Sequence, residues 1–256
     1  SRNGISQSGI VSHRMIIRPW DGEISLSGRV SERYLLANFL RQISFVEINK
    51  VKRLNDSAFI VWCIWKNRGV SMKKVAVLLA PGFEEAEAIV TIDILRRLQI
   101  EVETLACAES RAVVSYHDVP MVTDSTLAAR QTDLYDAVVL PGGPQGSVNL
   151  AASKAVIQFI ARHDEAGKLI CPVCSAAARV LGGNGLLKGR RYVCSGDLWQ
   201  NVTDGEYIDA PIVEDGNLIS GKGLGHIFDF ALTLAARLLG DDIPVRDHAD
   251  HIYYRW

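Results

Sequence analysis

Residues 168–181 read Lys168-Leu-Ile-Cys-Pro-Val-Cys-Ser-Ala-Ala-Ala-Arg-Val-Leu181, and they carry the strongest local signal in the chain. Residues 169–173 form a brief apolar run that small residues end abruptly, which is typical of a buried strand. The alanines and the leucine that follow favour a helix. Cys174 therefore lies at a sharp corner between a predicted strand and a predicted helix.

A thiol at this corner has a distinctive electrostatic setting. It faces the first free backbone N–H groups of the helix, and these donors and the helix dipole favour an anion. We therefore expect the pKa of Cys174 to lie below the ordinary thiol value of about 8.5, which would make the thiolate available for reaction. The corner resembles the nucleophile elbow of G-x-S-x-G hydrolases, although that motif is absent. The alternative is that Cys174 is a small buried hydrophobe.

The rest of the chain after residue 71 alternates strand and helix patterns. We predict strands at 74–80, 102–106, 137–140, 169–173 and 191–194, hairpins at 112–122 and 212–219, and helices at 84–99, 149–166 and 227–239. Such alternation implies a mostly parallel sheet with helices on both faces. The functional crevice of such folds lies at the carboxyl ends of the strands.

Charge is distributed unevenly along the 256 residues. The net charge is −1, but residues 1–71 carry 11 Lys and Arg against 5 Asp and Glu, and the remainder is acidic. This asymmetry suggests two segments with separate histories. Met72 runs directly into the first predicted strand, so we expect a non-essential N-terminal extension at 1–71, a functional domain from residue 72 to about 240, and a C-terminal tail at 241–256. The basic surplus of the extension is more typical of a solvated arm than of a nucleic-acid site.

Composition limits the class of protein. Hydrophobic residues make up 48% and charged residues 22%, as in soluble globular proteins. Five cysteines, an odd number without the paired spacing of a disulfide framework, favour a reducing compartment. The apolar run at 58–65 is far shorter than the roughly 20 residues that span a bilayer, and no secretory signal is visible. We expect a cytoplasmic protein without a membrane segment.

Two other segments fall at the predicted crevice. Glu84-Glu85-Ala86-Glu87 opens a helix there, where acidic residues also complement the dipole without any further role. Gly142 and Gly143 follow a strand, and successive glycines allow the backbone to approach a ligand and direct N–H groups at it. The alternative for the glycines is an ordinary tight turn. No G-x-G-x-x-G or P-loop motif supports a nucleotide cofactor.

The remaining cysteines and histidines indicate no further site. Cys171 and Cys174 have C-x-x-C spacing, but Cys171 falls inside the predicted strand, so a redox pair is disfavoured. No second C-x-x-C or H-x-x-x-H pair supports a metal. We interpret the other cysteines as structural, and the histidines at 163, 248 and 251 as surface residues.

The order of three motifs resembles a known family. Pro81-Gly-Phe-Glu-Glu-Ala-Glu87 follows the first strand, Val138-Val-Leu-Pro-Gly-Gly143 the fourth, and Cys174-Ser-Ala-Ala forms the corner. This pattern resembles the ThiJ/PfpI superfamily, especially the branch that contains the parkinsonism-associated deglycase and bacterial YajL-type proteins. The resemblance covers about residues 72–240. It implies a flavodoxin-like three-layer sandwich with a cysteine nucleophile elbow, and a homodimer.

The resemblance also implies roles for single residues. Cys174 matches the nucleophile, and Glu87 matches the protonated glutamate beside it. Gly142, Gly143 and the backbone of Ser175 match the donors to an oxyanion. Gly223 matches a glycine near the pocket, although the family often has Gly-Pro where this chain has Gly-Leu.

This chain departs from the family pattern at three positions. Ser175 stands where protease and amidotransferase branches place a histidine, which counts against a Cys–His peptidase or glutaminase. His117 aligns with a pocket arginine of the deglycase branch, and Ser195 aligns with a pocket histidine. These changes bear on substrate preference.

Two functional hypotheses follow. In the first, Cys174 attacks a small dicarbonyl such as methylglyoxal, free or as an adduct on amines, Glu87 moves protons, and no metal, cofactor or glutathione takes part. In the second, the protein is a non-enzymatic oxidative-stress sensor or chaperone that acts through oxidation of Cys174. A third possibility is a family member whose site is vestigial.

Overall fold

The structure is a computed structural model, and it describes residues 72–256. Its main sheet has seven strands in the order β10-β11-β7-β6-β1-β2-β5. Neighbouring strands are parallel except in the β10–β11 hairpin. The bounds are Lys74–Leu79 for β1, Glu101–Ala106 for β2, Ser125–Thr126 for β5, Ala137–Leu140 for β6, Leu169–Pro172 for β7, Ile212–Asp215 for β10 and Leu218–Gly221 for β11.

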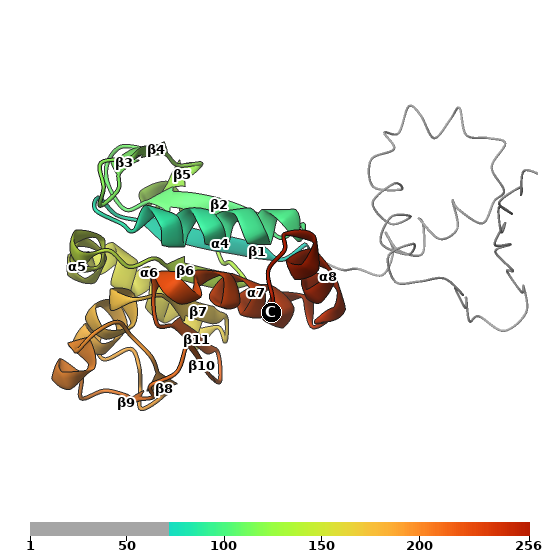
Figure 1. The fold of residues 1–256 in the computed structure, drawn as a ribbon. Helices are drawn as coiled ribbons and strands as arrows, with labels where there is room; N and C mark the ends of the chain where they lie inside the picture. Colours follow the sequence, from blue (N-terminus) through green and yellow to red (C-terminus); the bar gives the residue numbers. More distant parts are fainter. Residues whose placement is uncertain (1–71) are drawn as a thin grey trace, which may run out of the picture. The chain divides into compact units, whose positions relative to one another are not determined.

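Helices cover both faces of the sheet (Figure 1). Side chains of α4, α7 and α8 share one hydrophobic cluster, and side chains of α5 and α6 share the other. The arrangement confirms the predicted three-layer, flavodoxin-like sandwich. The bounds are Glu85–Arg97 for α4, Pro144–Ala152 for α5, Lys154–Glu165 for α6, Ile227–Leu239 for α7 and Ile243–His251 for α8.

Strand β1 supplies side chains to both layers. Val75, Val77 and Leu79 belong to the cluster under α4 and α7, while Ala76 and Leu78 belong to the opposite cluster. All five are fully buried. Successive side chains of a strand point to opposite faces, so a strand covered on both sides has a continuous apolar sequence. This explains why the first strand was predictable from the sequence.

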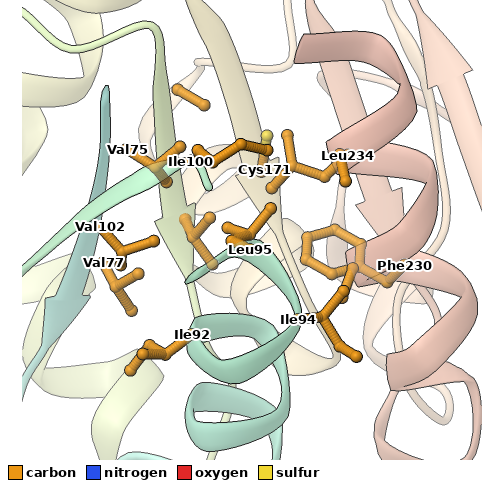
Figure 2. Packing of buried hydrophobic residues seen from close by; sticks show 14 of the residues in the cluster. Val75, Val77, Ile92, Ile94, Leu95, Ile100, Val102, Cys171, Phe230 and Leu234 are labelled. Carbon is orange, nitrogen blue, oxygen red and sulfur yellow. The ribbon is translucent and has the colours of Figure 1, made fainter. Parts of the chain in front are cut away.

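Helices α4 and α7 pack side by side on one face of the sheet. Figure 2 shows Ile94 and Leu95 of α4 close to Phe230 and Leu234 of α7, above the sheet. Full burial of each such side chain contributes about 1.5–3 kcal/mol. Replacing the fully buried Phe230 by alanine would therefore be the most damaging single change in this layer, because it would also leave a cavity.

The predicted helix at 149–166 is wrong in its bounds and continuity. The structure has two helices there, α5 and α6, and the first begins at Pro144. Ser153 separates them in an extended conformation, and its side chain accepts a hydrogen bond from the N–H of Val156 at 3.4 Å. Serine favours this capping position because its oxygen satisfies a free N–H of the new helix.

The helix after Cys174 differs in type from the prediction. Residues Ala177–Leu181 form a π-helical segment, and Gly182–Asn184 continue it as a 3₁₀ turn. Alanine-rich composition favours helical backbone in general and does not distinguish the wider π turn from the α form. π-Helical segments are frequent at functional sites.

Two small sheets lie beside the main one. Strands β3 (Ala112–Val114) and β4 (Pro120–Val122) form the antiparallel hairpin that the sequence predicted. The strand predicted at 191–194 is shorter, β8 (Arg191–Tyr192), and it pairs in parallel with β9 (Glu206–Tyr207). The two-residue edge strand β5 has too little sequence for a periodicity signal and was not predicted.

Two histidines that we expected on the surface are buried. His163 is completely enclosed, and both ring nitrogens are bonded, to the N–H of Tyr135 and to the carbonyl of Phe159. Burial lowers the pKa of His163, so a neutral ring that accepts through Nε2 fits this setting. His248 is 8% exposed because the residues expected to be a tail form α8, which packs on α7.

Within residues 72–256, none of the helices combines the length and the apolarity needed to cross a bilayer. The predictions made for residues 1–71 lie outside the described residues.

Candidate active site

Cys174 occupies a strained corner at the end of β7. Its φ angle is 57°, in the left-handed region that costs a residue other than glycine roughly 1–2 kcal/mol. The backbone is held on both sides, because its N–H donates to Gly221 O at 2.9 Å and its carbonyl accepts from Ser195 N at 3.2 Å. Such strain persists only where the surrounding structure enforces it, and it is concentrated at functional sites.

Glu87 enters the same place from the first turn of α4. Its side chain is 1% exposed, and Oε2 accepts a hydrogen bond from Gly142 N at 2.8 Å. The other oxygen, Oε1, has no hydrogen-bond partner within normal distance and angle limits among the described residues. Burial raises the pKa of Glu87 to about 7, against the opposing effects of the Gly142 N–H and the Cys174 thiol.

The pKa of Cys174 differs in direction from our prediction. Burial raises it, and the neighbouring charge of Glu87 raises it further. The Ser195 hydroxyl and the Ser175 N–H lower it, but by less. The helical N–H that the sequence argument relied on is therefore present, but burial and the carboxylate outweigh it. Protonation of Glu87 removes this repulsion, so the ionisation of each group disfavours that of the other.

The two glycines that follow β6, Gly142 and Gly143, are required for different reasons. A Cβ atom on Gly142 would lie 2.7 Å from Cys174 Cβ and 2.9 Å from Glu87 Oε2, so only glycine fits between the reactive groups. The N–H of Gly142 already donates to Glu87, so it is less available to an oxyanion than the sequence suggested. Gly143 has a φ of 97°, and a Cβ there would collide with Gly82 O.

The structure brings most of the predicted residues together. A Cβ on Gly223 would lie 3.7 Å from Cys174 Sγ and 4.0 Å from Glu87 Oε1, so this glycine borders both reactive groups. Ser195 reaches the thiol with its hydroxyl, and the N–H of Ser175 faces the sulfur. These contacts join segments that are up to about 136 residues apart along the chain.

His117 lies elsewhere. It belongs to the β3–β4 hairpin, its side chain is 62% exposed, and Nδ1 bonds Glu85 Oε1 at 2.7 Å. With Glu84 these two residues place three possible ligand atoms within 4.8 Å of one another. The His117–Glu85 hydrogen bond explains this grouping without a metal, and exposed carboxylates often cluster in this way.

Sequence reasoning missed two residues behind the elbow. Ser147, on α5, is fully buried and contacts the hydroxyl of Ser175 at 2.9 Å. Arg179 of the π-helical segment donates to Ser147 Oγ at 3.1 Å. A lone serine in a helix and a lone arginine in an alanine-rich run give no sequence signal for such a contact.

A model of the DJ-1/PfpI family matches residues 73–237, a range that includes Glu87, Cys174 and Gly223. The chain belongs to the DJ-1/PfpI family. Its DJ-1/PfpI domain is similar to a Salmonella typhimurium DJ-1 superfamily protein, solved as a cysteine-to-alanine mutant. That match has 82% identity and a TM-score of 0.72, and covers 72% of this chain and 100% of that one.

Two curated relatives extend the comparison. Protein dj-1beta of Drosophila melanogaster is 37% identical over 172 residues, which are 66% of this chain and 91% of that protein. The glutathione-independent glyoxalase DJR-1.2 of Caenorhabditis elegans is 30% identical over 175 residues, 67% of this chain and 92% of that protein. The DJ-1/PfpI domain of this chain therefore corresponds to nearly the full length of both relatives.

Proposed function

We propose that the protein converts small dicarbonyls such as methylglyoxal into hydroxy acids, free or as adducts on amines, with Cys174 as the nucleophile. The observation that supports this most is the buried Glu87 carboxyl, with a pKa of about 7, beside a thiol on a strained corner. A group with a pKa near the working pH both donates and accepts protons readily. The relative that is a glutathione-independent glyoxalase supports the same chemistry.

The first step forms a carbon–sulfur bond. The thiol proton of Cys174 passes to the Glu87 carboxylate while the sulfur attacks the aldehyde carbon of methylglyoxal. The carbonyl oxygen takes up the electron pair and then a proton from Glu87, giving a hemithioacetal. Glu87 returns to its ionised form and is ready for the second proton transfer.

The second step moves hydrogen between neighbouring carbons. Glu87 removes the proton from the former aldehyde carbon, which gives an enediolate, and returns this proton to the adjacent carbon. The hydroxyl proton of the hemithioacetal passes to the oxygen of that adjacent carbon, so that one oxygen becomes the thioester carbonyl and the other the hydroxyl. The product is a lactoyl thioester of Cys174. Water hydrolyses this ester to lactate and the free thiol, so the overall reaction adds one water to methylglyoxal and needs no external oxidant or reductant.

Backbone donors stabilise the oxygen that becomes negative. Because the Gly142 N–H is bonded to Glu87, we assign this role to the N–H groups of Gly143 and Ser175. Neutral backbone donors in a buried site stabilise developing charge strongly because they need no reorganisation. Ser195 and Gly223 would border the substrate.

The second candidate is a sensor that acts through oxidation of Cys174. The protonated carboxyl of Glu87 beside the sulfur favours it, because it would donate to an oxygen of a sulfenic or sulfinic acid. The two functions differ in stoichiometry. An enzyme turns over many substrates per thiol, whereas a sensor takes up one peroxide equivalent at each oxidation step. In either case, the homodimer implied by the family resemblance remains a prediction.

The test is lactate formation from methylglyoxal by the full chain, without metal or glutathione. We expect turnover that is lost in Cys174→Ala and strongly reduced in Glu87→Gln. Cys107→Ala is the matched control, because Cys107 is also half-buried but lies after β2, and it should keep parental turnover. Lactate formation no faster than in Cys174→Ala would contradict the proposal, and intact mass after peroxide treatment would then test the sensor.

A further inference from the structure

A network of hydrogen bonds lies directly behind the Cys174 corner. Its centre is the hydroxyl of Ser147, which donates to Gly143 O at 2.8 Å. The hydroxyl oxygen of Ser147 also accepts from Ser175 Oγ at 2.9 Å and from Arg179 Nη1 at 3.1 Å. A hydroxyl has one proton and two lone pairs, so these three bonds use its full capacity. The Ser175 hydroxyl also has a longer alternative acceptor, Gly143 O at 3.4 Å, which belongs to the same network.

The network reaches the first oxyanion donor through Gly143. The carbonyl of Gly143 accepts from both the hydroxyl and the N–H of Ser147. The carbonyl of Gly142 accepts from Glu84 N at 3.1 Å, and it shares a rigid peptide plane with the N–H of Gly143. Both sides of Gly143 are thus held, at a φ of 97° that favours glycine. This fixes the direction of the Gly143 N–H.

The network reaches the second donor through Ser175. The N–H of this residue faces the Cys174 sulfur, and its hydroxyl bonds to Ser147. Ser175 is only 5% exposed, so its hydroxyl depends on protein partners, and Ser147 Oγ at 2.9 Å is nearer than Gly143 O at 3.4 Å. A single buried hydroxyl therefore links Ser175 to the carbonyl of Gly143, the two residues whose N–H groups we assign to the oxyanion.

Arg179 holds the network from the outer side. Its Nη1 donates to Pro144 O at 2.8 Å as well as to Ser147. It therefore bridges the π-helical segment Ala177–Leu181 to the first turn of α5. A charged donor makes a stronger hydrogen bond than a neutral one, which favours Arg179 as the anchor of the network.

We propose that Ser147 and Arg179 are positioning residues, which hold the N–H groups of Gly143 and Ser175 in the geometry that binds the oxyanion. The inference rests on the proposed function, because the oxyanion is that of the carbonyl reaction. Neither side chain touches the reacting atoms. Their effect is expected on kcat, since misplaced donors weaken stabilisation of the transition state more than binding of the substrate.

The first test measures kcat and KM for lactate formation in Ser147→Ala and Arg179→Ala. Loss of a whole oxyanion donor costs about 100-fold or more in kcat. We expect displacement of a retained donor to cost less, about tenfold, with KM changed by less than about twofold. Arg179→Lys keeps a charged donor and should recover most of the loss.

The matched control is Arg237→Ala. Arg237 lies on α7 and donates to Glu214 Oε2 at 3.1 Å and to Gly216 O at 2.8 Å, one side chain and one carbonyl, as Arg179 does. Its loss should leave kcat at the parental value. An equal loss in Arg237→Ala would show that the effect of Arg179 is one of general stability and would overturn the inference.

A second readout does not depend on turnover. The rate of Cys174 alkylation by iodoacetamide is measured against pH in the parent and in both alanine variants. Because the Ser175 N–H lowers the pKa of Cys174, release of Ser175 should move the profile to higher pH. Unchanged profiles in both variants would overturn the inference, whatever their turnover. A parent that forms no lactate would contradict the proposed function alone.

Discussion

Two buried glutamates, Glu87 on α4 and Glu103 on β2, have opposite chemistry. Glu87 lies beside the carboxyl ends of the strands, accepts one N–H and has a pKa raised to about 7. Glu103, on β2, accepts from Lys74 Nζ at 2.8 Å, Arg130 Nε at 2.7 Å and Tyr135 OH at 2.8 Å. Burial alone would raise its pKa as well, but these bonds lower it to about 2.

The difference shows what separates a structural charge from a reactive one. Burial acts on both carboxylates in the same direction, so it does not decide their state. The number and the charge of the donors decide it. Glu103 has two cationic partners and stays ionised, whereas Glu87 has only neutral neighbours that lower its pKa, the Gly142 N–H and the Cys174 thiol. An incompletely satisfied carboxyl is the one able to exchange protons with a substrate.

The largest expected effect is on turnover. We expect Glu87→Gln to lower kcat for lactate formation about 1000-fold, because it removes a general acid and base. Its free energy of unfolding at pH 7 should not fall, since the amide needs less hydration than a buried carboxylate. Steady-state kinetics and urea unfolding measure the two quantities. A Glu87→Gln variant with the parental kcat would contradict the role of Glu87 as the general acid and base.

The pH dependence of stability should have opposite signs at the two residues. The folded pKa of Glu87, about 7, lies above its ordinary value of 4.5, so the native state binds more protons and its stability falls as pH rises through this window. At 1.36 kcal/mol per pH unit the loss is at most about 3 kcal/mol. We expect Glu87→Gln to gain stability relative to the parent between pH 5 and pH 8.

For Glu103 the sign is reversed. Its folded pKa of about 2 lies below 4.5, so its stabilising contribution is present above pH 4.5 and is lost as pH falls toward 2. Unfolding in urea at several pH values, for the parent and each glutamine variant, tests both signs. Parallel curves for the parent and Glu87→Gln from pH 5 to pH 8 would contradict the raised pKa of Glu87.

Glu103→Gln should reverse the pattern of Glu87→Gln. It leaves Lys74 and Arg130 without their buried partner, although both cations are partly exposed and regain water. We therefore expect a loss of about 2 kcal/mol in the free energy of unfolding, below the 3–5 kcal/mol of a fully buried pair. Turnover per folded molecule should stay at the parental value. Reduced turnover in a fully folded sample would show that Glu103 and the site around Glu87 are coupled.

The smallest effect concerns backbone strain. Gln99 has a φ of 61°, close to the 57° of Cys174, but it is exposed and lies after α4. Gln99→Gly should raise stability by about 0.5 kcal/mol, because relief of the left-handed conformation outweighs the greater freedom of glycine in the unfolded chain. Turnover should not change. Thermal unfolding measures the gain, and a loss of stability would show that φ alone does not measure strain here.

Much of the fold could be predicted from local pattern. Strand β1 is a continuous apolar run because both of its faces are covered, and α7 ends at Gly240, which adopts the left-handed conformation typical of helix ends. The break at Ser153 was missed because Ser153 sits inside a run that is apolar and helical on both sides. The exposed positions assigned to His163 and His248 were wrong because partners distant in sequence enclose them.

The candidate site was predictable in composition but less so in chemistry. The motifs around Glu87, Gly142 and Cys174 follow three strands, and parallel topology brings the carboxyl ends of strands to one edge. The pKa of Cys174 was predicted in the wrong direction because the helix terminus is local, whereas burial and the Glu87 charge come from other segments. The position of His117 also depends on tertiary structure, because the β3–β4 hairpin places its ring against Glu85.

The amino-acid order alone therefore indicated most of the strands and helices, the corner at Cys174 and the resemblance to the family. These depend on periodicity and on residues close together in the chain. Only the packed molecule established the raised pKa values of Cys174 and Glu87, the use of the Gly142 N–H, and the links of Ser147 to the elbow. These depend on burial and on distances between segments, because a carboxyl or a hydroxyl takes its properties from the partners that tertiary structure supplies.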